Sequence, residues 1–187
     1  IYVVKTDSFG NVEWTQTYGG DGQDGGHSII NTFDGGYVIT GFETIENYTD
    51  VFLLKVDSLG NEVWHYNSES TEHDRGSRVI QTEDSSFVIT GTTEQNGNKD
   101  LLIIKTDNNG NELWTKTLGG DEREQGNSII QTKENEFVLT GYTESFSNGD
   151  ADVWLIKVQE DSTFISDSTN YLDFFPIHIG DKWQYFT

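Results

Sequence analysis

The chain repeats itself at a constant interval of 50 residues. The motif Asp-x-x-Gly-Asn-x-x-Trp occurs three times in one register. Its repeat positions are Asp7, Asp57, Asp107, Gly10, Gly60, Gly110, Trp14, Trp64 and Trp114. A fourth unit starts two residues late at Asp152, and the pattern ends after Val158. A period of this length predicts an architecture in which similar units pack against their neighbours.

Each period contains four short segments that are typical of β-strands. In the first complete period they cover residues 27–32, 37–41, 51–56 and 62–66, which are rich in Val, Ile, Phe, Tyr and Thr. No useful length of chain shows helical spacing. The third segment is almost continuously apolar, as in Leu101–Ile104, which predicts that both faces of its sheet are covered. The sequence therefore predicts an all-β fold.

Four strands in a unit of about 40–50 residues are typical of one blade of a β-propeller. The predicted blades are residues 1–17 (partial), 27–67, 77–117 and 127–166, the last completed by a strand at Thr163–Ser166. A ring closes with about 4–8 blades, so about three and a half blades predict an arc of a larger ring. A second chain could complete that ring. A β-solenoid is the alternative fold.

The last residues differ in composition from the repeats. Residues 159–170 are polar and irregular, and we expect a linker there. Residues 171–187 hold a dense aromatic cluster and the single proline of the chain. They are either the start of a second domain or a tail that packs against the last blade.

The strongly acidic composition restricts the partners. The chain has 11 basic and 32 acidic residues, a formal net charge of -21. We expect no nucleic-acid partner, because binding phosphates requires Lys and Arg. We also expect no membrane insertion, since no apolar run approaches the roughly 20 residues of a span. Cysteine is absent, so neither disulfides nor thiolate metal sites are available.

The repeated motif is predicted to be a hairpin turn. The Asp can accept hydrogen bonds from amides of the turn, and the Gly tolerates positive φ. The alternative is a calcium loop, but an EF-hand has its Gly at the sixth position, whereas this Gly follows the Asp by three residues. The position before the Gly is Phe9 in the first copy and Leu59 in the second, and neither side chain can bind a cation. We expect the Trp to pack between blades; a stacking platform for sugar rings is the alternative.

The connection between units is rich in acidic residues and, in two copies, in glycine. We expect no metal site there, and the alternative is a calcium site. Its candidate ligands are Asp21, Asp24, Asp74, Asp121 and Glu124. A phosphate loop would need a Gly-rich backbone that leads into a helix, but this segment joins two strands. No nucleophile elbow or histidine ligand spacing occurs, so we expect no catalytic residue and no cofactor.

These repeats resemble the β-propeller repeats of bacterial secreted and cell-surface proteins. The matching features, over residues 1–158, are the Asp-x-x-Gly-Asn-x-x-Trp turn, Gly-Gly-Asp, Ser-Ile-Ile-Gln-Thr and Phe-Val-x-Thr-Gly. The resemblance implies an extracellular or cell-envelope location and a non-enzymatic role. It brings no catalytic residues.

We predict a binding or scaffold module for a protein or a glycan. Its ligand would contact the connections that do not repeat, residues 44–49, 93–99 and 144–151. The alternatives are a fragment of a propeller enzyme with its active site on the ring axis, and a purely structural spacer.

Overall fold

A computed structural model describes residues 1–95, 97–147, 149–159 and 175–176. Those residues form antiparallel strands and no helix, which confirms the all-β prediction. We name the sheets I to IV in chain order: I has β1 (Tyr2–Thr6) and β2 (Val12–Thr17); II has β3 (Gly25–Asn31), β4 (Tyr37–Ile45), β5 (Tyr48–Val56) and β6 (Glu62–Asn67); III has β7 (Arg75–Gln81), β8 (Phe87–Gln95), β9 (Asn98–Thr106) and β10 (Glu112–Leu118); IV has β11 (Glu124–Gln131), β12 (Phe137–Thr143), β13 (Asp152–Val158) and β14 (Phe175–Pro176).

Every sheet is a meander in which consecutive strands pair. The register repeats with the sequence: Val38 lies opposite Lys55 in sheet II, and Val88 lies opposite Lys105 in sheet III. Each four-stranded sheet has an irregularity at the same place in its first strand, after Gly26, Gly76 and Gly126. A constant register over different side chains means that the sheets present equivalent faces to their neighbours.

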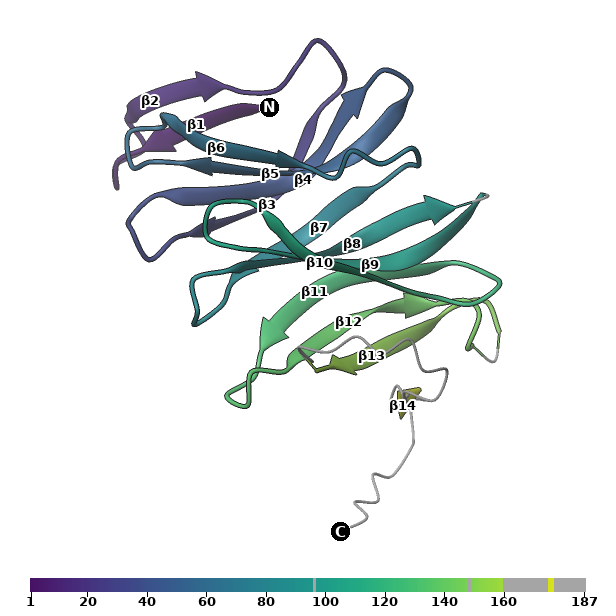
Figure 1. Ribbon diagram of the computed structural model, residues 1–187. Helices are drawn as coiled ribbons and strands as arrows, with labels where there is room; N and C mark the ends of the chain where they lie inside the picture. The colour runs from purple at the N-terminus through teal and green to yellow at the C-terminus, as the bar shows by residue number, and fades with distance from the viewer. Residues whose placement is uncertain (96, 148, 160–174, 177–187) are drawn as a thin grey trace.

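Successive sheets stack face to face (Figure 1). Three clusters of buried apolar side chains from the described residues lie between them. The third strand of sheet II contributes to two of them. Leu53 packs in the cluster with sheet III, whereas Leu54 packs in the cluster with sheet I. Both side chains are buried. The cover on both faces that the continuous apolar run predicts is therefore present.

The hairpin between the second and third strands is longer than the sequence predicts. Residues 44–49, expected as a loop, continue the ladder through the pairs Thr44–Thr49 and Ile45–Tyr48. Residues 93–95 and 98–99 continue it in the same way in sheet III. Backbone pairing does not require apolar side chains, so a polar segment can still be a strand. The connection at 144–151 does lie between strands, after β12 and before β13.

The C-terminal predictions fall largely outside the described residues. The expected strand at Thr163–Ser166, the linker at 159–170 except Gln159, and most of 171–187 lie there. Within the described part, β14 pairs with β13 at Trp154 and Leu155. No helix in the described ranges is long and apolar enough to cross a membrane.

Candidate functional site

The three Asp-x-x-Gly-Asn turns hold their own carboxylates. Asp57 Oδ1 accepts hydrogen bonds from the N–H groups of Leu59 (2.8 Å) and Asn61 (2.9 Å). Its Oδ2 accepts one from Asn61 Nδ2 at 2.9 Å. The same bonds recur at Asp7 and Asp107, and the hydrogen bond from each Asn side chain lowers the pKa of the Asp. This geometry describes a self-contained hairpin turn.

The motif tryptophans lie at the junctions of successive sheets. Trp14 Nε1 donates a hydrogen bond to the carbonyl of Ser58 at 3.2 Å, in the turn of the next sheet. A Cβ added to Gly60 would lie 3.0 Å from the Trp14 ring. Trp64 lies against Gly110 in the same way. Trp114 packs on Phe137 of sheet IV, with ring centroids 6.2 Å apart.

In sheet II a buried lysine of the third strand binds the turn between the first and second strands. Lys55 Nζ donates to Thr32 Oγ1 at 3.0 Å and to Asp34 Oδ1 at 2.8 Å, and only 4% of its side chain is exposed. The bond from Lys55 lowers the pKa of Asp34 to about 2. In sheet III, Lys105 Nζ binds Asp84 Oδ2 at 3.1 Å. The lysines and the Thr-x-Asp segments both recur with the 50-residue period, but the sequence does not show that they meet.

Burial acts on Asp84 in the opposite direction to its hydrogen bonds. Partial burial raises the pKa of this carboxyl, but donors from Thr82, Ser86 and Lys105 outweigh it and lower the pKa to about 2. Both Asp34 and Asp84 are therefore held in the charged form. In sheets II and III, the Lys of the third strand thus binds the Asp of the turn between the first and second strands, and we call this Thr-x-Asp turn with its Lys the Thr-Asp-Lys latch.

Three of the proposed calcium ligands occupy equivalent positions at the start of a first strand. Asp24 accepts a hydrogen bond from the N–H of Thr44 at 3.2 Å. Glu124 is fully buried and accepts from Gly120 N, Thr143 Oγ1 and Ser145 N. Asp74 is also buried. Asp21 and Asp121 are exposed. The described residues contain no group of three or more acidic, His or Cys side chains placed to hold a metal ion.

The acidic side chains that approach one another form two pairs, Asp50 with Asp74 and Asp100 with Glu124. The sequence analysis named Asp74 and Glu124 but not their partners. Burial raises the pKa of Asp50, and the charge of Asp74 raises it further. Burial likewise raises the pKa of Asp100, with a further contribution from Glu124. Burial also raises the pKa of Asp74, whose Oδ1 is buried without a hydrogen-bond partner. The recurrence of Asp at positions 50 and 100 was the available signal.

A second ion pair lies on sheet II. His65 Nε2 is 3.0 Å from Glu43 Oε1, and Asn67 Nδ2 donates to the same oxygen. The bond from Glu43 raises the pKa of His65. Burial alone would raise the pKa of Glu43, but the bonds from His65 and Asn67 lower it. Each partner therefore favours the charged form of the other.

The β4–β5 hairpin and the β12–β13 connection carry exposed apolar side chains. Ile45 is 47% exposed, Tyr48 41% and Phe146 40%. The Tyr48 ring lies beside His73, with centroids 5.7 Å apart. In sheet III the residues at the positions of Ile45 and Tyr48 are the polar Gln95 and Asn98. These connections join second to third strands, so they lie at the same end of the stack as the acidic connections between sheets. They offer exposed apolar contact area for a ligand.

No protein-family model matches the chain, and no curated protein sequence matches it significantly. The resemblance to bacterial surface repeats stays a prediction.

Proposed function

We propose that the chain is part of a β-propeller and acts as a non-enzymatic binding or scaffold module. Supporting the ring arrangement are four-stranded meanders that repeat in register, and a tryptophan that docks on the glycine of the next sheet at two junctions. A constant relation between neighbours generates a regular curved array. About three and a half blades would then form an arc of the ring.

The binding end is the end that carries the connections between second and third strands. The single observation behind this assignment is that a repeated frame exposes different side chains there, apolar in sheets II and IV and polar in sheet III. Exposed aromatic side chains such as Tyr48 and Phe146 supply rigid contact area for a protein surface or a sugar ring. We propose an extracellular or cell-envelope setting, where such ligands occur.

Binding of the chain to a glycan array and to cell-surface proteins tests this proposal. Tyr48→Ala and Phe146→Ala should each weaken binding about tenfold or more, as truncation of an aromatic anchor does. Leu59→Ala is the matched control, because Leu59 is 68% exposed in the β5–β6 turn at the opposite end. Absence of any binding would favour the structural spacer. Equal losses in all three variants would contradict the assignment of the binding end.

A further inference from the structure

Sheet I has only the counterparts of the third and fourth strands of the other sheets. β5 pairs with β4 and β6, and β9 pairs with β8 and β10. Their counterpart β1 pairs with β2 alone among the described residues. The second edge of β1 therefore presents backbone N–H and C=O groups to any strand that can pair with them.

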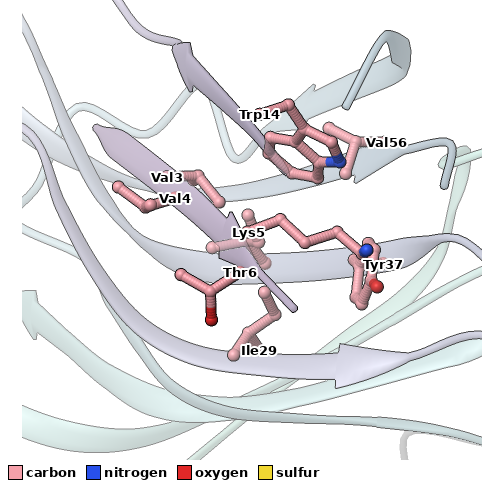
Figure 2. A pocket seen from close by; sticks show the side chains of 9 residues that line it. Val3, Val4, Lys5, Thr6, Trp14, Ile29, Tyr37 and Val56 are labelled. Atoms are coloured by element: carbon pink, nitrogen blue, oxygen red, sulfur yellow. The ribbon is translucent and has the colours of Figure 1, made fainter. Parts of the chain in front are cut away.

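A pocket of about 210 Å³ runs along this edge (Figure 2). Sheet I contributes Val3, Val4, Lys5, Thr6 and Trp14 to its lining, and sheet II contributes Ile29, Tyr37, Ile39 and Val56. The Lys5 side chain extends across it towards Tyr37 (Figure 2). The lining is mainly apolar, so a side chain that fills the pocket must be apolar too.

The repeat itself shows what covers the same position elsewhere. Ile29 is 53% exposed, whereas its counterparts Val79 and Ile129 are 0% and 1% exposed. Val79 shares a cluster with Val38, and Ile129 shares one with Val88. Val38 and Val88 belong to the second strand of the preceding sheet. The side chain missing over Ile29 is therefore that of a second-strand valine.

The charge on this edge also lacks its usual partner. Lys55 and Lys105 are buried and bind the Asp of a Thr-Asp-Lys latch. Lys5 occupies the same repeat position, but its side chain is 31% exposed and pairs with Glu13, which is 42% exposed. The counterparts of Glu13 are the apolar Val63 and Leu113. An exposed ion pair is weak, so Lys5 can exchange Glu13 for a better partner.

We propose that the free edge of β1 is a docking site for a β-hairpin from a further unit of this repeat. The hairpin has the chemistry of β7–β8: a first strand with a Val-Ile pair, a Thr-x-Asp turn and a Phe-Val-Ile-Thr-Gly second strand. The hairpin binds β1 whether or not the connections between second and third strands hold a ligand.

The register of the hairpin follows from sheet III. Val88 lies opposite Lys105, Thr90 opposite Ile103 and Gly91 opposite Leu102. On β1 the corresponding partners are Lys5, Val3 and Tyr2. The valine then fills the pocket over Ile29 and Tyr37, and the Asp of the turn reaches Lys5. The threonine hydroxyl donates to the carbonyl of Tyr2, as Thr90 Oγ1 donates to Leu102 O at 3.2 Å.

A peptide with the sequence of residues 77–92 tests the proposal in trans with the full chain. Calorimetry measures its affinity, and hydrogen exchange measures protection of the amides of β1. We expect binding, slower exchange in β1, and about tenfold weaker binding of the peptide with Asp84→Asn, which removes a charged partner of Lys5. The peptide with Val88→Asp should not bind. The chain with Lys5→Gln should bind the peptide with Asp84→Asn almost as tightly as it binds the unsubstituted peptide. Lys99→Gln, an exposed lysine of sheet III, is the matched control and should bind as the wild type does.

A free hairpin is only marginally stable in water, so a second experiment uses a chain that carries the hairpin covalently and thereby lowers the cost of ordering it. Residues 75–100 are joined directly ahead of Ile1, because Ile1 is the counterpart of Leu101. We expect a higher urea midpoint than that of a matched chain whose added segment carries Asp84→Asn and Val88→Asp. Equal midpoints, together with no peptide binding, would overturn the proposal. So would binding that ignores Val88→Asp or leaves β1 unprotected.

Discussion

The indole of Trp64 lies on Gly110, 46 residues further along the chain and in the next sheet. A Cβ placed on Gly110 would be 2.7 Å from Trp64 Cε3, closer than side-chain carbons come. Gly110 also has a φ of 83°, which glycine adopts without strain. One glycine therefore serves two purposes, forming the turn and leaving room for the ring of the neighbouring sheet.

Gly110→Ala should destabilise the chain by about 2–4 kcal/mol, of which about 1 kcal/mol is the strain of positive φ and the rest is displacement of the Trp64 ring. Urea unfolding measures this loss. Gly10→Ala is the matched control, because Gly10 has a φ of 85° and nothing lies within 4 Å of an added Cβ. It should cost only about 1 kcal/mol. Equal losses at the two glycines would mean that the contact with Trp64 contributes nothing.

Acid should weaken the two Thr-Asp-Lys latches. The pKa values of Asp34 and Asp84 are lowered from 3.8 to about 2 in the folded chain. A lowered folded-state pKa gives stability that is present above the unfolded value and is lost as pH falls through the folded value. The contribution should therefore disappear between about pH 4 and pH 2. A chain with both Asp34→Asn and Asp84→Asn should lose less stability over that range, measured by urea midpoints. An unchanged pH dependence in this variant would contradict the assignment.

Asp50→Asn should raise the free energy of unfolding at neutral pH. Burial raises the pKa of Asp50 above 3.8, so its charged form costs stability at any pH above that value. Asn keeps an oxygen for the N–H of Ser70, which donates to Asp50 Oδ1 at 3.0 Å. The gain should vanish at a pH well below 3.8, where the carboxyl is neutral in both states. Asp121→Asn, at an exposed acid, controls for the change in net charge. A gain that persists in acid would show another cause.

Calcium should leave the thermal unfolding temperature unchanged. The oxygens of Glu124 already accept three hydrogen bonds, and those of Asp57 accept bonds from their own turn. Calorimetry at about 1–10 mM calcium and in a chelator provides the test, because weak extracellular sites have dissociation constants of about 0.1–1 mM. A reproducible rise with calcium would reveal a cation site and restore the calcium alternative.

The period of the sequence located most of the strands, and local chemistry explained the turns. Asp57 and Asn61 are four residues apart, so their bonds could be anticipated from the motif alone. The pairing of Asp50 with Asp74 could not, because Asp50 lies on β5 and Asp74 in the connection that precedes β7, and nothing local marks their approach. The extension of β3 back to Gly25 was also hidden, since glycine is disfavoured in strands and its pairing with Phe42 is long-range.

The sequence by itself determined the unit: four strands, a turn closed by its own Asp and Asn, and a tryptophan at a fixed place. Those features depend on residues close together in the chain, and a local pattern is enough to specify them. Only the tertiary structure decided what each repeated side chain does. Val79 is buried and Ile29 exposed, and Lys55 is latched while Lys5 is not, although each pair shares a repeat position. Burial and charge pairing depend on which strands pack against a residue. The repeat pattern alone does not show whether those strands are present.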